Sequence, residues 1–278
     1  EYADYASANA EIGSVFAQSQ TRLENRFFLN LGGRVDAHSQ FGTHATFQAG
    51  AAYFVPGSET KLSANVGTGF EAPDLYQLYD PSYGNTELQP EANTGVDVGF
   101  EQPLGRIKVG ATYFHDDYNN LFGSDPSTYQ YINIARAMTQ GIESFVEING
   151  IKNLTWRVDY TYLDTKDLST PSDDLDAGMA LLRRPAHQGD MDASYNFGKL
   201  ELGGTLSYVG ARLDEDFNAG TLLTLPAYIL VNLRGSYQLD DQIKLFARVD
   251  NLFDQTYEDV YGYGTPGLSA YGGIKVSL

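Results

Sequence analysis

Carboxylates are the commonest side chains in this sequence that could hold a metal, and they gather in two segments. Calcium prefers hard oxygen ligands of this kind. Neither segment has the alternating ligand spacing of a dedicated calcium loop, so we expect solvated acidic loops, with loop calcium as the alternative and no other cofactor. The two groups are Asp173, Asp174 and Asp176, and Asp214, Glu215 and Asp216.

Two further motifs could bind a ligand, but each is weak evidence for a binding site. His38 and His44 flank segment 37–43, but a metal site needs a third ligand at suitable spacing, and we expect none. Segment 262–267, Gly-Tyr-Gly-Thr-Pro-Gly, matches the dinucleotide fingerprint letter for letter. It precedes a predicted strand instead of opening a helix, so the phosphate-binding geometry is absent and we expect a glycine-rich loop.

Several carboxylates alternate with apolar residues along predicted strands. General acid–base chemistry would need a nucleophile or partner at reliable spacing, and the sequence offers none. We therefore predict no enzyme, and expect these groups to hydrogen-bond arginines on the same face, such as Arg157 and Arg248. The carboxylates are Asp159, Asp190, Asp192 and Asp250.

Tyrosines in the predicted connections are the best candidates for contact with a ligand. A tyrosine ring supplies a flat apolar surface and its hydroxyl bonds polar groups, while an arginine at a strand end would meet an anionic group. The alternative for each residue is packing within a loop or at a membrane boundary. The candidates are Tyr76, Tyr79, Tyr83, Tyr129, Tyr131, Arg212, Tyr261 and Tyr263.

The elements that must position these residues are strands. In 243–250, Ile243, Leu245, Ala247 and Val249 alternate with polar-leaning residues, as in a strand with one apolar face. The pattern recurs and predicts an all-β, antiparallel chain of about thirteen strands. They span 9–20, 25–36, 44–55, 60–70, 92–101, 106–118, 130–149, 154–165, 186–197, 200–212, 227–239, 243–254 and 268–278.

The spacing of these strands favours a transmembrane β-barrel over a soluble β-sandwich. About ten residues in a tilted strand cross the apolar band of an outer membrane. Short and long connections alternate, as in barrels with tight periplasmic turns and long extracellular loops. The short connections are 56–59, 102–105, 149–153, 198–199 and 240–242; the others are 37–43, 71–91, 119–129, 166–185, 213–226 and 255–267.

Composition narrows the class of protein further. A net charge of −18 argues against binding a nucleic-acid backbone. The absence of cysteine excludes a disulfide scaffold and zinc–thiolate chemistry. No run of about 18 apolar residues exists, so a transmembrane helix is excluded. The 20 tyrosines and 15 phenylalanines suit the aromatic girdles of a membrane barrel.

Several strings resemble TonB-dependent outer-membrane receptors of Gram-negative bacteria. They are VGTGFEAPDLYQLY (66–79), GNTELQPE (84–91), GIESFVEI (141–148), LLRRPAHQ (181–188), SYVGARLDED (207–216) and ARVDNLFDQTYEDVYGYGTPG (247–267). The cobalamin-receptor group is most similar, through SQFGTHATFQ (39–48) and the ending at 252–267. The resemblance implies active uptake of cobalamin or a related corrinoid, with a ferric siderophore as the alternative substrate. A passive porin-like channel is a further alternative.

The resemblance also implies parts beyond these residues. Such receptors have about 22 strands around a plug, so residues 1–278 are expected to form the C-terminal part of the barrel, without plug or N-terminal strands. Its edge strands would pair with those missing strands, carried by the same receptor or by a second polypeptide. Expected partners are outer-membrane lipid, lipopolysaccharide and, through the plug, the TonB energy-coupling complex.

The last strand resembles the assembly signal of barrel proteins, in which a polar residue, a glycine and two hydrophobic residues have fixed spacing. Leu278 stands where an aromatic residue is usual. The alternative is a final strand that simply presents an apolar face. The matching residues are Tyr271, Gly273, Val276 and Leu278.

Overall fold

Thirteen antiparallel strands form one curved sheet in the computed structural model, which describes residues 8–125, 128–148, 151–169, 178–216 and 219–277. Their order across the sheet is their order in the chain, from β1 at one edge to β15 at the other. The strands are β1 (Ile12–Leu23), β2 (Phe27–His38), β3 (Gly42–Phe54), β4 (Lys61–Glu71), β5 (Glu91–Leu104), β6 (Ile107–Ser124), β7 (Tyr131–Ile148), β8 (Leu154–Asp167), β9 (His187–Asn196), β10 (Leu200–Val209), β13 (Tyr228–Gln238), β14 (Ile243–Asp250) and β15 (Ser269–Val276).

The predicted all-β, antiparallel fold with about thirteen strands is confirmed. Most strand ends fall within about three residues of the predicted ones; the exceptions are β6, which continues to Ser124 instead of 118, and β14, which ends at Asp250 instead of 254. The structure adds two features inside predicted loops. A short helix, α1 (Leu75–Tyr79), lies in 71–91, and β11 (Arg212–Asp216) pairs with β12 (Thr221–Leu225) as a separate hairpin.

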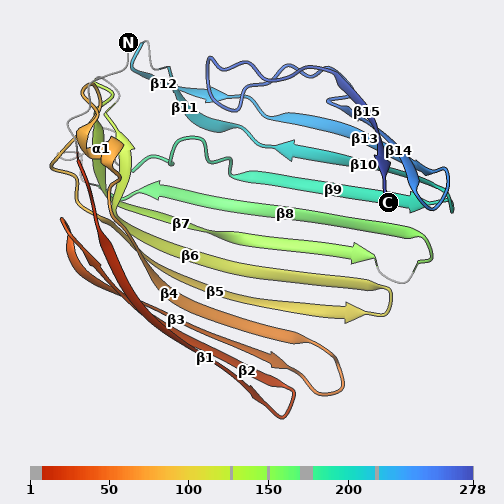
Figure 1. Cartoon of the computed structure of the whole chain (residues 1–278), viewed down its shortest axis with the longest axis horizontal. Coiled ribbons are helices and arrows are strands. Elements are labelled where there is room, and N and C mark those ends of the chain that lie inside the picture. The colour runs from red at the N-terminus through yellow and green to blue at the C-terminus, as the bar shows by residue number, and fades with distance from the viewer. Residues whose placement is uncertain (1–7, 126–127, 149–150, 170–177, 217–218, 278) are drawn as a thin grey trace.

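Long and short connections lie at opposite ends of the sheet (Figure 1). The end that carries α1, the β11–β12 hairpin and the other long connections is called the loop end, and the end with the tight turns is called the turn end. This segregation matches the alternation predicted from the sequence. It places the candidate tyrosines together at one end of the molecule.

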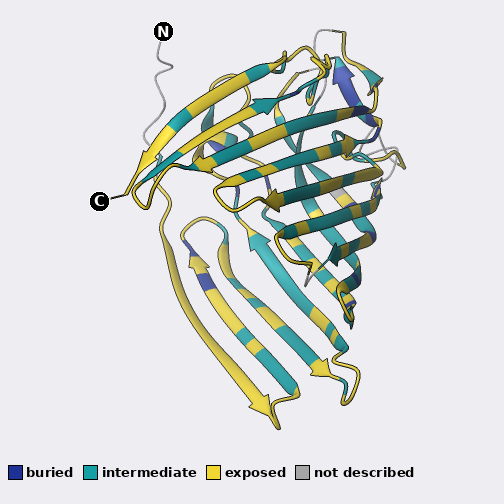
Figure 2. Cartoon of the chain, turned by 90° about the vertical axis from the view of Figure 1, so that its right-hand side faces the viewer, coloured by how far each residue is buried: buried dark blue, intermediate teal, exposed yellow. Residues whose placement is uncertain are grey.

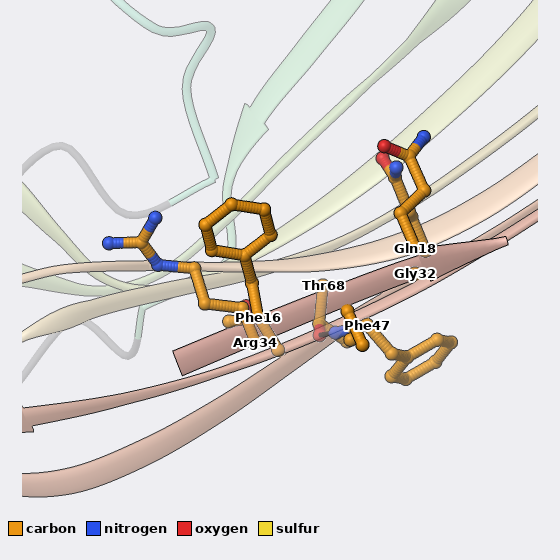
Figure 3. A pocket seen from close by; sticks show the side chains of 10 residues that line it. Phe16, Gln18, Gly32, Arg34, Phe47 and Thr68 are labelled. Carbon is orange, nitrogen blue, oxygen red and sulfur yellow. Dashed lines mark hydrogen bonds between the residues drawn. The ribbon is translucent and has the colours of Figure 1, made fainter. Parts of the chain in front are cut away.

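The sheet has a polar and an apolar face. Phe16, Gln18 and Arg34 point toward the inside of the curve, whereas Phe47 points away from it (Figure 3). The registers put Arg34, Arg157 and Arg234 on this same inward face, which we call the polar face. The outward, apolar face exposes large hydrophobic side chains, including Val98 at 53%. Contiguous apolar surface of this kind marks contact with a partner or a membrane.

Buried residues are few, because most of the chain is a single layer (Figure 2). The buried apolar side chains gather toward the loop end, where loops pack on strand ends, and they are Leu78, Leu88, Ala137, Leu225 and Tyr228. Among the described residues, no helix is long and apolar enough to cross a lipid bilayer. Every residue of the edge strand β1 is exposed.

Glycines on the polar face allow rings from neighbouring strands to lie flat against the sheet. Phe114 on β6 is opposite Gly141 on β7, and Phe246 on β14 is opposite Gly273 on β15. A Cβ at either glycine would collide with the facing ring, and at Gly141 also with the backbone oxygen of Tyr162. These positions therefore require glycine for close approach rather than for a special backbone angle.

Candidate functional site

One group of candidate tyrosines lies where the α1 loop meets the loop ends of β6 and β7. The rings of Tyr76 and Tyr131 meet edge to face, with centroids 6.1 Å apart. The backbone N–H of Tyr131 donates to the oxygen of Tyr83 at 2.8 Å, and Asn85 Nδ2 donates to the oxygen of Tyr131 at 2.8 Å. The structure thus brings together tyrosines that lie about fifty residues apart in sequence.

The α1 helix is held by a capping box. Asp74 accepts a hydrogen bond from the N–H of Gln77 at 2.7 Å, and Gln77 accepts one from the N–H of Asp74 at 2.9 Å. Both donors would otherwise be unsatisfied at a helix start. The hydroxyl of Tyr79 accepts a hydrogen bond from Gln40 at 3.2 Å, while Tyr129 adopts a left-handed backbone with φ of 60°. We call residues Tyr76, Tyr79, Tyr83, Tyr129 and Tyr131 the first tyrosine group.

The remaining candidates lie on the β11–β12 hairpin and the loop between β14 and β15. Contact between Arg212 and an anionic ligand stays a prediction; the structure shows the contacts that Arg212 makes within the chain. It is only 5% exposed, bonds the backbone oxygen of Glu258, and lies 3.4 Å from a carboxylate oxygen of Asp259. Tyr261 and Tyr263 remain accessible, at 37% and 69% exposed.

Asp214 joins three loop-end segments and was missed as a structural residue. Its side chain is fully buried and accepts hydrogen bonds from Arg183 Nε at 2.8 Å and from the N–H of Tyr261 at 2.7 Å. Burial alone would raise the pKa of this carboxyl, but the bonds from Tyr261, Arg183 and the N–H of Glu215 together lower it. The expectation that 213–226 is a solvated acidic loop is wrong for Asp214 and Glu215.

The loop between β14 and β15 is also held from within. Asn251 is 5% exposed; its Nδ2 donates to the oxygens of Gln255 and Pro266, at 2.9 and 3.3 Å, and its Oδ1 accepts from the N–H of Gln255. Asn232 on β13 in turn accepts from the N–H of Asn251 at 2.8 Å. The string VDNLF therefore contains a residue that shapes the loop, although its sequence pattern alone indicates only a strand end.

A recess of about 350 Å³ opens at the loop end between β6, β7, segment 180–184 and β11. Its wall combines apolar residues of the two long strands with charged residues of the loops. A concave site with apolar walls and a few charged groups is the usual form of a small-molecule site. Its principal side chains are Leu121, Phe122, Ile132, Ile134, Arg183, Arg184 and Glu215.

The expected pairing of inward carboxylates with arginines is confirmed for Asp159, Asp192 and Asp250, whereas Asp190 is bonded by a serine. Arg157 bonds Asp159 through Nε at 2.8 Å and reaches Glu147 at 3.2 Å. Arg248 lies 3.3 Å from Asp250. The other predicted carboxylates are also bonded: Asp192 by Arg234 at 2.7 and 2.8 Å, and Asp190 by Ser207 at 2.5 Å. These ion pairs do not resemble the acid–base groups of an active site.

No group of three or more potential metal ligands occurs in the part of the chain that the structure describes. Asp173, Asp174 and Asp176 lie outside the described residues. The ring nitrogens of His38 and His44 bond backbone groups of their own turn, at 3.1 Å to the N–H of Gln40 and 2.8 Å to the oxygen of Phe41. Segment 262–267 is a loop before β15, as its place before a strand predicted.

The residues of the predicted assembly signal divide between the two faces of β15. Tyr271 and Gly273 lie on the polar face, opposite Arg248 and Phe246 of β14. Val276 lies on the apolar face, opposite Ile243. Leu278 lies outside the described residues, and the signal stays a prediction.

Known proteins resemble this chain in sequence and in fold. Residues 2–252 match the family described as "TonB dependent receptor-like, beta-barrel". The vitamin B12 transporter BtuB of Vibrio cholerae serotype O1 is 34% identical over 235 residues, which is 83% of this chain and 36% of that protein. The chain thus spans about a third of the length of the curated relatives it matches.

Solved structures share the fold at lower identity. The siderophore receptor PirA of Acinetobacter baumannii has a TM-score of 0.80 and 18% identity, over 99% of this chain and 47% of that one. The ferric enterobactin receptor PfeA of Pseudomonas aeruginosa, a G324V mutant, has 0.77 and 22%, over 97% and 45%. A structure described as copper transporter OprC has 0.79 and 18%, over 97% and 48%.

Proposed function

The chain belongs to the TonB-dependent receptor β-barrel family, and on this premise we propose that it is the barrel part of an active transporter for cobalamin or a related corrinoid. The family lies in the outer membrane of Gram-negative bacteria, and so does this chain. The exposed apolar face supports a position in lipid, where lipopolysaccharide would surround the loop end. The family consists of receptors and transporters, and we propose no enzymatic activity.

The observation that carries the corrinoid proposal is the 34% identity with the vitamin B12 transporter. The siderophore receptors among the solved structures are only 18% and 22% identical. Their likeness supports the fold and leaves a ferric siderophore as the second candidate substrate. A passive channel is a third candidate, supported only by the polar lining of the curved sheet.

We further propose that residues 1–278 form the C-terminal part of a larger barrel of about 22 strands with a plug. Support comes from the edges: β1 and β15 are the two ends of an open sheet, and unpaired backbone groups cannot face hydrocarbon. The remaining strands and the plug would belong to the same receptor or to a second polypeptide. Energy from the TonB complex would act through that plug.

Corrinoid binding tests this function directly. The receptor, purified from outer membranes in detergent with whatever accompanies it, is titrated with cyanocobalamin and separately with ferric enterobactin. Saturable cyanocobalamin binding at or below about 1 μM, corresponding to roughly −8 kcal/mol, is expected. Saturation by the ferric siderophore alone contradicts the corrinoid assignment. Absence of both, together with steady ion conductance in planar bilayers, supports the passive channel instead.

The first tyrosine group is expected to contribute to that binding. Tyr76→Ala removes an exposed ring and should weaken cyanocobalamin binding about tenfold, since an aromatic contact contributes roughly 0.5–1.5 kcal/mol beyond its buried area. The matched control is Tyr237→Ala, which removes a ring of similar exposure, 43% against 45%, from the apolar face of β13. Equal affinities in the two variants would place the ligand elsewhere.

A further inference from the structure

Two lysines face each other across the last two strands without a carboxylate. Lys244 on β14 is the direct partner of Lys275 on β15, so both side chains leave the sheet on its polar face. Within the part of the chain that the structure describes, neither has an ion-pair partner within 4.0 Å. Like charges placed directly opposite each other destabilise a sheet. This pair therefore lacks the compensation that an anionic neighbour would supply.

Most other cations of the polar face are compensated inside the chain; Arg22 on β1, which lies over the ring of Phe28, has no ion pair among the described residues. Lys61 and Lys108 share the carboxylate of Glu101. Arg157 pairs with Glu147 and Asp159, Arg234 with both oxygens of Asp192, and Arg34 with Asp36. The contrast is informative because the chain as a whole carries a net charge of −18. A shortage of carboxylates cannot explain an uncompensated cation pair.

The surroundings of the lysines form a recess of about 450 Å³ on the polar face. Its floor is Phe246, 48% exposed, whose ring covers Gly273. Arg234 and Arg248 are direct partners across β13 and β14 and border the recess on the side away from the turn end. Glu201 also lines it, but forms no ion pair with either lysine among the described residues. The recess is thus cationic with an apolar floor.

We infer that this recess is the binding site of an acidic polypeptide segment that belongs to the plug and lies inside the barrel. Because it assumes a plug, the inference rests on the proposed function. A pair of carboxylates would neutralise Lys244 and Lys275, and an adjacent apolar side chain would cover Phe246. Strands β13–β15 then bind the occupant through the charges of these two lysines. Lys61 and Lys108 do not bind it, because both are already paired with Glu101. The occupant is recognised by its negative charge and one apolar group.

Zero-length coupling of amines to carboxylates tests the inference on the unaltered receptor. The receptor is isolated from outer membranes with all accompanying polypeptides, treated with a water-soluble carbodiimide, digested and sequenced by mass spectrometry. Lys244 and Lys275 are expected to be joined to aspartate or glutamate residues that lie outside the 278 residues of this chain. Coupling of Lys61 to Glu101, whose atoms are 2.8 Å apart, is the internal positive control.

Links from the two lysines only to carboxylates of this chain, such as Glu201, overturn the inference, and so does their absence when Lys61 is coupled. Charge reversal adds a second readout. The Lys244→Glu, Lys275→Glu double variant should lower the salt concentration that releases the occupant, with retention about tenfold weaker. The control is Lys199→Glu, because Lys199 is exposed at the turn end and its ammonium group donates a hydrogen bond to the backbone oxygen of Leu239.

The outcomes separate this inference from the transport proposal. If the receptor binds cyanocobalamin but Lys244 and Lys275 form no links, the transport proposal is supported and the inference about the recess is wrong. If the links form but no corrinoid binds, the inference about the recess is supported and the substrate assignment is wrong.

Discussion

Replacing Asp214 by asparagine should lower the free energy of unfolding of the loop end by about 3 kcal/mol, which is the lower end of the range for breaking a buried ion pair. The carboxylate is fully buried and serves two donors, one on Arg183 and one on the backbone of Tyr261. An amide offers a single oxygen, so its NH₂ group must face one of these donors. Hydrogen exchange of peptides from 251–268 should accelerate about a hundredfold.

Asp241→Asn is the matched control, because Asp241 is exposed at the turn end and its change should leave exchange in 251–268 as it is. The pH dependence gives a second check. Since the folded-state pKa of Asp214 is lowered, its stabilising contribution is complete above the unfolded value of about 3.9 and is lost as pH falls through the lower folded value. Variant and wild type should therefore differ equally at pH 5 and pH 8. A difference that vanishes at pH 5 contradicts this assignment.

Gly141→Val should severely reduce the amount of barrel that folds. A Cβ at position 141 would meet the backbone oxygen of Tyr162 on one side and the ring of Phe114 on the other. A backbone oxygen cannot rotate away, so two strands must separate locally, at a cost of about 3 kcal/mol or more. The share of protein that resists unfolding in SDS without heating should fall by at least about tenfold, as judged by gel mobility.

Gly33→Val provides the comparison. Gly33 lies in the middle of β2, its nearest neighbour to an added Cβ is the oxygen of Thr46 at 3.9 Å, and that is ordinary contact. Valine favours strands, so this variant should fold like the wild type. If both valine variants are lost equally, the effect is a general intolerance of valine for glycine and not the predicted collision.

Alternation along the chain was enough to predict the sheet, because each strand needs only its own residues to define two faces. The least accurate boundary was the end of β6, where Asn119 and Asn120 indicate a turn, although residues up to Ser124 continue to pair with β7. The β11–β12 hairpin was missed for a different reason. Its strands are five residues each, and the local sequence around Asp214 and Glu215 indicates a solvent-exposed acidic loop.

The candidate site was predictable in its residue types and not in its contacts. Tyr76, Tyr83 and Tyr131 were selected singly, but only the folded chain shows that they touch. Arg212 was selected for its charge, and its partner Asp259 lies 47 residues away. A sequence pattern carries no information on such pairings, because the distance between two loops is fixed by the strands that separate them.

The order of the strands, in which each lies beside its neighbour in the chain, has a consequence for how such a wall forms. Each new strand closes only the connection to its neighbour in the chain, so the entropy lost at each step does not grow with the number of strands already placed. Formation can proceed as a zipper from either edge, with the last strand offering the next one its template. The same order lets a whole hairpin be gained or lost during evolution while the pairing of all the others is preserved.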